Sequence, residues 1–181
     1  TRLSGRVDAA ALGRALKALV ARHEALRTRF ETIDGEPYQR IAAADAFDMD
    51  YVDLRGEADI EGRRRALAEA CFEAPFDLER DLPLRAQLLR LDDERYEFRL
   101  VAHHIAADGW SVGIALDELN RLYAAELDAR QASLSPLRLQ YADFALWQRD
   151  WLAHGQFERQ TDFWKRALAG APTLLELPTD R

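Results

Sequence analysis

The residues best suited to chemistry lie between positions 103 and 111, in the order His-His-Ile-Ala-Ala-Asp-Gly-Trp-Ser. Histidine can take a proton from an amine or a hydroxyl at neutral pH, so either imidazole could serve as a general base. A carboxylate at Asp108 could fix a local charge or orient the loop. Gly109 permits close approach of backbone and unusual dihedral angles. This segment therefore predicts acid–base chemistry.

The hydrophobic pattern places the segment between a strand and a helix. Alternation over 95–105 predicts a strand with one apolar face that ends at His104, formed by Tyr96, Phe98, Leu100, Ala102 and His104. A helix is predicted from 110 to about 129, with an inward stripe of Val112, Ala115, Leu116, Leu119, Leu122, Tyr123 and Leu127. The N–H groups that begin this helix would face the segment, which suits a developing oxyanion.

Three other interpretations fit the same residues. The histidines could be ordinary polar residues at a strand end. A metal site built from His103, His104 and Asp108 would need converging imidazoles, yet neighbouring strand residues point to opposite faces, and no further His or Cys lies nearby in sequence. A nucleophilic triad is weaker, because Ser111 is better explained as the N-cap of the helix. No metal is therefore expected.

Strands and helices alternate along the rest of the chain, with hairpins between some of them. Asp8 is a predicted N-cap, followed by a helix with a buried stripe of Leu12, Leu16, Leu19, Val20 and His23. The other expected strands span 3–7, 26–33, 38–41, 49–54 and 84–91, with a turn at Asp34-Gly35; the other expected helices span 60–72 and about 139–169, the latter broken near Gly155. This order predicts an α/β sandwich.

Composition narrows the function classes. The chain has 181 residues, of which 48% are hydrophobic, enough for one compact domain. A net charge of −7 gives no support for nucleic-acid binding, and no apolar run approaches the ~18 residues of a membrane span. Cys71 is the only cysteine, which excludes an intrachain disulfide and predicts a small packed hydrophobe. A cytoplasmic location is expected, and both ends suggest a piece of a longer protein.

Four ordered segments resemble the condensation domains of nonribosomal peptide synthetases, members of the chloramphenicol-acetyltransferase-like (CAT-like) superfamily. Residues 103–109 resemble the family's HHxxxDG motif, and residues 22–30, RHEALRTRF, resemble RHExLRTxF. Residues 141–148, YADFALWQ, resemble YxDYAxWQ, and 163–181 resemble the stretch leading into the second lobe. The resemblance covers the whole chain. It implies an α/β, CAT-like two-layer sandwich over 1–181, the N-terminal lobe of a condensation domain.

The resemblance also implies roles for individual residues. His104 would orient or deprotonate the α-amine of an acceptor as it attacks a thioester, and His103 would support it, turned into the fold. Asp108 would hold the loop by pairing with Arg27, since a bidentate guanidinium can lock a loop that a lone carboxylate cannot. Gly109 would line the channel where the substrates meet. Trp147 and its neighbours would serve core and lobe packing.

The reaction so implied is amide formation between a carrier-bound acyl or peptidyl thioester and a carrier-bound aminoacyl group. The partners would be donor and acceptor peptidyl carrier proteins, the C-terminal condensation lobe and an adjacent adenylation domain. No cofactor would be bound directly, because the substrates arrive on phosphopantetheine arms. The family's first motif and C-terminal lobe are absent, so the fragment alone is expected to be inactive.

Subtype features favour a peptide-bond-forming member. The run Asp108-Gly109-Trp110-Ser111-Val112 differs from that of epimerisation members, and heterocyclisation members replace the histidines with aspartates. The tail from Leu174 resembles members that accept an L-configured donor. The alternatives are a non-catalytic docking platform for a tailoring enzyme, a stand-alone acyltransferase using coenzyme A, and a structural piece without activity of its own.

Overall fold

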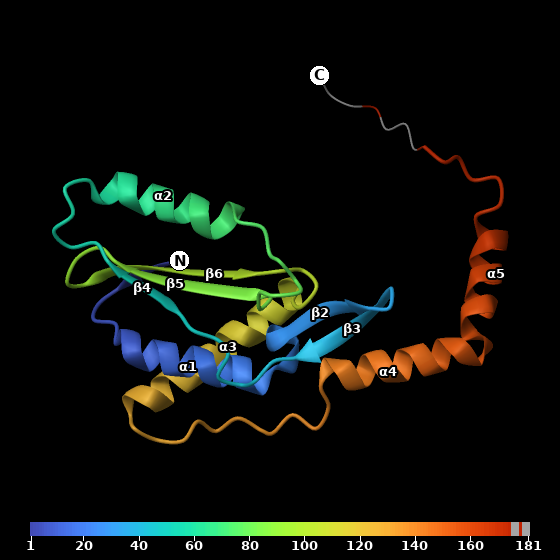
Figure 1. Cartoon of the computed structure of the whole chain (residues 1–181), viewed down its shortest axis with the longest axis horizontal. Helices are drawn as coiled ribbons and strands as arrows, with labels where there is room; N and C mark the ends of the chain where they lie inside the picture. The colour runs from blue at the N-terminus through green and yellow to red at the C-terminus, as the bar shows by residue number, and fades with distance from the viewer. Residues whose placement is uncertain (175–177, 179–181) are drawn as a thin grey trace. The chain divides into compact units, whose positions relative to one another are not determined.

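A computed structural model describes residues 1–174 and 178 (Figure 1). The chain divides into two compact units, Thr1–Ala142 and Asp143–Arg181. All the described strands and the histidine segment belong to the first unit.

The centre of the first unit is a four-stranded sheet with strand order β1-β6-β5-β4. Its strands are β1 (Arg2–Ser4), β4 (Asp50–Asp53), β5 (Leu84–Arg90) and β6 (Arg95–Ala102). β5 runs antiparallel to β6 and parallel to β4. The strands expected at 49–54 and 84–91 are thus present, whereas the strand expected over 3–7 ends at Ser4 and the one expected to reach position 105 ends at Ala102.

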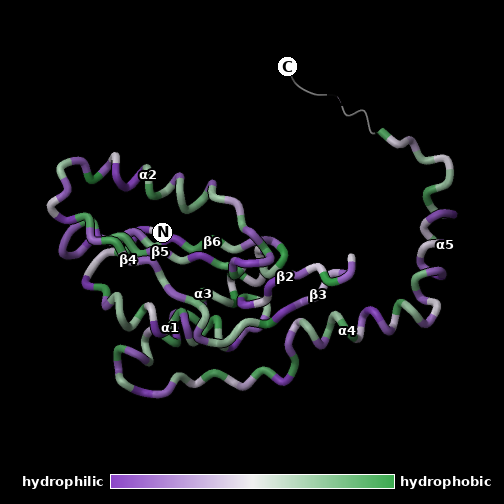
Figure 2. Tube along the Cα trace, in the orientation of Figure 1, coloured by the Kyte–Doolittle hydropathy of each residue, from purple (hydrophilic) through white to green (hydrophobic). Residues whose placement is uncertain are grey.

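Helices lie on both faces of this sheet (Figure 1). Helices α1 (Ala9–Arg22) and α3 (Gly109–Leu127) cover one face, and α2 (Ile60–Glu73) lies over the other. Hydrophobic residues recur along α1 and the strands (Figure 2), and they form one core on the α1 face, whose fully buried members include Leu16, Leu19, Val20 and Leu88. This is the predicted α/β sandwich, with α2 added on the second face.

Helix α1 begins and ends largely as the sequence predicts. The Asp8 side chain caps it by accepting a hydrogen bond from the Ala11 N–H (2.9 Å). Past its end, a 3-10 turn, Glu24–Arg27, leads into β2 (Thr28–Ile33), so this strand starts two residues later than expected. β2 pairs with β3 (Glu36–Ile41) in a separate hairpin.

The hairpin turn falls on Asp34 and Gly35, as predicted. Both residues have positive φ, 52° and 82°. Two consecutive residues of this kind are typical of a type I′ turn, whose twist matches that of the flanking strands.

A buried arginine fastens α2 to the sheet. The Arg99 side chain is 1% exposed and donates to Glu97 Oε1 (2.7 Å), Gln87 Oε1 (2.8 Å) and the carbonyl of Arg64 in α2 (2.9 Å). Arg64 in turn donates to Glu97 Oε2 at 2.8 Å. Each nitrogen of the Arg99 guanidinium thus has an acceptor, which offsets the cost of burying its charge.

Cys71 lies on α2 and is buried, as predicted. Its burial raises the pKa of the thiol above the ordinary value. The packing environment thus favours the uncharged form of the side chain.

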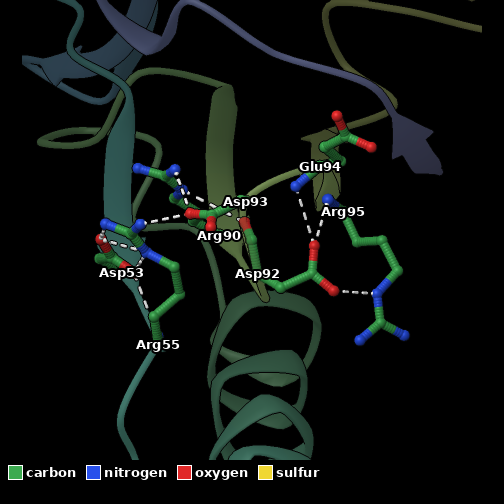
Figure 3. Close-up of polar contacts among 7 residues, drawn as sticks. All are labelled: Asp53, Arg55, Arg90, Asp92, Asp93, Glu94 and Arg95. Atoms are coloured by element: carbon green, nitrogen blue, oxygen red, sulfur yellow. Dashed lines mark hydrogen bonds and ion pairs between the residues drawn. The ribbon is translucent and has the colours of Figure 1, made fainter.

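An ion-pair network joins the end of β4 to the β5–β6 hairpin (Figure 3). Arg55 donates to Asp53 Oδ2 at 2.7 Å and to Asp93 Oδ1 at 2.6 Å, and Arg90 reaches the same Asp93 oxygen at 3.0 Å. The side-chain hydrogen bonds from Arg55 lower the pKa of Asp53 from 3.8 to about 2. The network therefore favours the ionised carboxylate.

The second unit holds most of α4 (Tyr141–Trp151) and all of α5 (Phe157–Ala167). Between them the helix is interrupted at Leu152–Gln156, where Gly155 takes a φ of 82°, so the predicted break is confirmed. Trp147 stacks on Trp151, with ring centroids 5.9 Å apart. Trp147 is 57% exposed and is not part of the core of the first unit, and its predicted role in core and lobe packing stays a prediction. Most of the tail from position 174 lies outside the described residues.

Candidate active site

The two adjacent histidines take different environments. The chain leaves β6 at Ala102, and a turn closes with a hydrogen bond from the Ala106 N–H to the His103 carbonyl (3.0 Å). His103 is half-buried: its Nδ1 accepts from the Ile105 N–H at 3.0 Å, and its ring packs edge-on against Phe76. His104 lies in the turn and is exposed. His103 packs against Phe76, as expected for a ring turned into the fold, and the predicted divergence of the two imidazoles stays a prediction.

Asp108 holds the start of α3. Its Oδ1 accepts from the Ser111 N–H (2.8 Å) and from the Ser111 hydroxyl (2.6 Å). These hydrogen bonds hold the pKa of Asp108 below its ordinary value. The residue expected as N-cap, Ser111, is therefore already inside the helix, and that prediction is wrong. Both residue types cap well, but Asp108 has the extended backbone that a cap requires.

Gly109 is the first residue of α3 and is exposed. A Cβ placed there would meet no heavy atom within 4 Å. In this lobe the position is open, so its predicted place in a channel stays a prediction.

Arg27 does not pair with Asp108. Its Nη1 donates to the carbonyl of Ala42 (2.5 Å), and its Nη2 to the carbonyl of Ala21 (3.5 Å) and to Glu24 Oε1 (3.3 Å). The predicted ion pair between Arg27 and Asp108 is therefore wrong. Both side chains bind nearby partners instead. Arg27 connects the end of α1 to the segment after β3, and Asp108 caps its own helix.

An apolar cavity of about 220 Å³ lies beside the histidine segment. Ala106 and Ala107, which directly follow the histidine turn, form part of its wall, and Ser111 of α3 forms another part. The remaining lining residues come from α1, the following turn, β5, β6, α3 and the start of α4: Leu19, His23, Ala25, Leu26, Leu84, Leu100, Ala102, Val112, Ile114, Ala115 and Tyr141.

A buried carboxylate contacts His23, one of the residues that line this cavity. Glu118 of α3 is 9% exposed, and its Oε2 accepts from Arg22 Nε (3.0 Å) and lies 2.6 Å from His23 Nε2. Burial opposes ionisation of Glu118, but the hydrogen bonds from His23 and Arg22 outweigh it and keep the pKa of the carboxyl below its ordinary value. An ionised Glu118 therefore fixes the orientation of the His23 ring.

Sequence reasoning missed the pairing of His23 with Glu118. It placed His23 on the buried stripe of the first helix and gave it no chemistry, and it did not single out Glu118. The available signal was a histidine ending an otherwise apolar stripe in one motif, and an acid immediately before the inward-facing Leu119. Neither feature reveals that residues 95 positions apart meet.

Metal binding and membrane insertion can be examined over residues 1–174 and 178. Among these residues no three His, Cys, Asp or Glu side chains are grouped so as to hold a metal ion. None of the helices in this part of the chain has the length and apolar character needed to span a bilayer.

Comparison with known proteins gives consistent results. The family model of the Condensation domain matches residues 1–181. The chain is 45% identical over 179 residues to malpinin synthetase of Mortierella alpina and 47% identical over 182 residues to a linear gramicidin synthase of Brevibacillus parabrevis. Each alignment covers 99% of this chain but only 2% of the relative.

A solved structure shows a similar fold. The X-domain from teicoplanin biosynthesis, in complex with OxyB, superposes with a TM-score of 0.80 at 38% identity, over 99% of this chain and 39% of that one. The chain belongs to the condensation-domain family. It has the family's CAT-like mixed helix and sheet fold, and it is related to parts of nonribosomal peptide synthetases.

Proposed function

We propose that this chain is the histidine-bearing lobe of a condensation domain that forms an amide bond between two thioester-bound substrates. The observation that carries the proposal is the exposed His104, which lies on a turn between β6 and α3, two residues before Ala106 in the wall of an apolar cavity. The surrounding scaffold is fixed by the capped helix and by the inward packing of His103. A base held on such a scaffold suits proton transfer.

In the proposed reaction, the α-amine of the acceptor attacks the carbonyl carbon of the donor thioester. His104 orients the amine and accepts the proton that it loses as the C–N bond forms. The C–S bond then breaks, the amide is released from the donor carrier, and the departing thiolate takes up a proton. The chain supplies the base, while the substrates arrive on phosphopantetheine arms of donor and acceptor carrier proteins. The second lobe and an adjacent adenylation domain complete the proposed cytoplasmic assembly.

The test is His104→Ala in the complete condensation domain, with loaded donor and acceptor carrier proteins. Loss of a general base costs about 10²–10⁴-fold in rate, so dipeptidyl product should fall by that factor. His154→Ala, at a histidine on the helix break after α4, is the matched control and should leave the rate unchanged. Unchanged turnover in His104→Ala would refute the proposed role.

A docking platform is the second candidate, because the X-domain that this chain resembles is found in complex with OxyB. A platform needs no base, so the presence of both histidines favours catalysis. The two candidates differ in the same experiment. Wild-type protein that yields no dipeptidyl product, but binds a tailoring enzyme, would support the platform.

A further inference from the structure

His23 lines the cavity and is held through one of its two ring nitrogens. Its Nε2 is held by Glu118 Oε2 at 2.6 Å, and its Nδ1 makes no hydrogen bond to any residue in the described part of the chain. The ring is also part of the cavity wall. Because the ionised carboxylate of Glu118 can only accept, Nε2 carries the hydrogen between them, which leaves Nδ1 to contact a ligand.

Most of the cavity wall is apolar, and its other polar side chains are those of Ser111 and Tyr141. Leucine, valine, isoleucine and alanine side chains make most of the lining, and Ser111 Oγ already donates to Asp108. A few placed polar groups in an apolar pocket fix the orientation of a ligand, while the apolar wall supplies contact area. A volume of about 220 Å³ lies below the range for drug-sized ligands, so the space suits a single residue-sized group.

We propose that His23 is a specificity-determining residue, whose Nδ1 accepts a hydrogen bond from the amide N–H of the donor acyl chain. This inference rests on the proposed function. There the acceptor amine is engaged by His104, and the group assigned to His23 is the amide N–H next to the donor's own side chain. Glu118 is the positioning residue that selects the ring tautomer, and Arg22 holds Glu118 in place from the other side.

The experiment compares two donor substrates in the complete condensation domain. One is an N-acetyl-aminoacyl group on its carrier protein, and the other is the same group with the amide N–H replaced by an ester oxygen, which removes the hydrogen-bonding N–H with little change of shape. The wild type should favour the amide substrate in kcat/KM by about tenfold, the effect of one buried hydrogen bond left unmade. In His23→Phe the preference should vanish, while His23→Asn, which keeps an acceptor near the Nδ1 position, should restore part of it.

The control is Ile114→Ala, a change in the apolar wall of the same cavity. It should alter kcat/KM for both donor substrates by the same factor and leave their ratio at the wild-type value. A purely structural role of His23 predicts the same behaviour for His23→Phe, so an unchanged ratio in that variant sinks the proposal. If His23→Phe does not fold, the double variant His23→Phe/Glu118→Gln replaces it. This variant also removes the buried charge of Glu118, and its ratio of kcat/KM for the two donor substrates is compared with that of the wild type.

A measurement on the wild type makes the result independent of variants. The nitrogen NMR signal of His23 Nδ1 should shift when the amide substrate is added and shift less with the ester substrate. No shift with either would also overturn the proposal. Absence of product from the wild-type protein with both substrates would instead count against amide formation itself, so the two failures are distinguishable.

Discussion

The Asp108 carboxylate accepts hydrogen bonds from both the backbone N–H and the hydroxyl of Ser111, at 2.8 and 2.6 Å. The aspartate of the histidine motif thereby caps the helix that carries Glu118 and part of the cavity wall. Its contribution to the site in this lobe is made through the position of α3, and it needs no arginine partner for that.

Asp108→Ala is expected to lower the thermal unfolding midpoint by about 2–4 °C, the usual effect of losing an N-cap in a domain of this size. Asp108→Asn keeps an oxygen that can cap and should stay near the wild type. Circular dichroism melts of the three proteins make the comparison. A melt of Asp108→Ala that matches the wild type would contradict the capping role.

Arg99→Met should destabilise the first unit by about 3–5 kcal/mol, because it leaves the half-buried Glu97 with one cation fewer and Gln87 without its donor. Adding Glu97→Gln removes a carboxylate that then has only Arg64 as its cationic partner, and it should recover part of the loss. Denaturant unfolding measures both. Arg130→Met, which removes an exposed ion pair with Asp128, serves as the control and should change stability by less than about 1 kcal/mol.

The Asp53–Arg55 pair should make acid stability sensitive to Arg55. The folded-state pKa of Asp53 is about 2 against an ordinary 3.8, so its contribution is present above the ordinary value and is lost as pH falls through the folded one. Arg55→Gln should therefore melt below the wild type near neutral pH, and the gap should narrow on acidification to about pH 2.

The comparison for this pair is Arg95→Gln at the neighbouring Asp92. Backbone N–H groups are the largest cause of the lowered pKa of Asp92, and they remain in that variant. Its gap to the wild type should change less with pH. A gap for Arg55→Gln that stays constant from neutral to acid pH would show that the pair has no such linkage.

Cys71 should react slowly with alkylating reagents while the protein is folded. Burial raises the pKa of its thiol, and the thiolate is the reactive form. We expect labelling near pH 8 to be at least about tenfold slower in native protein than in denaturant. Arg99→Met should accelerate native labelling by loosening α2, and mass spectrometry follows the single site directly. Equal labelling rates in the folded and the unfolded protein would show that the packing of α2 does not shield the Cys71 thiol from the reagent.

Long periodic elements were predictable because a buried stripe repeats along each of them. Leu12, Leu16, Leu19 and Val20 recur at helical spacing and are all buried against the sheet. In α3 the same reasoning overreached: Val112, Leu116 and Leu127 were expected inward but are 40%, 42% and 54% exposed. Periodicity identifies an apolar stripe, but it does not tell how much of that stripe a neighbour covers.

The histidine segment was predicted in its residues and only partly in its contacts. The opposite facing of His103 and His104 was expected from strand geometry, but β6 ends at Ala102 and both histidines lie beyond it. The choice of Asp108 as the helix cap, and the use of Arg27 by Ala42 and Ala21, depend on local backbone conformation that residue types leave open. The contact of His23 with Glu118 depends on how α1 and α3 pack, which no local pattern encodes.

The turn after α1 has a mechanical consequence. Within this short stretch Arg27 binds the carbonyl of Ala21 on one side and that of Ala42 on the other, and the Thr28 hydroxyl donates to the carbonyl of Glu24. The β2–β3 hairpin, which shares no strand with the larger sheet, is thus bound directly to the helix end that carries His23. Through these hydrogen bonds, a displacement of the hairpin would also displace the end of α1, where His23 forms part of the cavity wall.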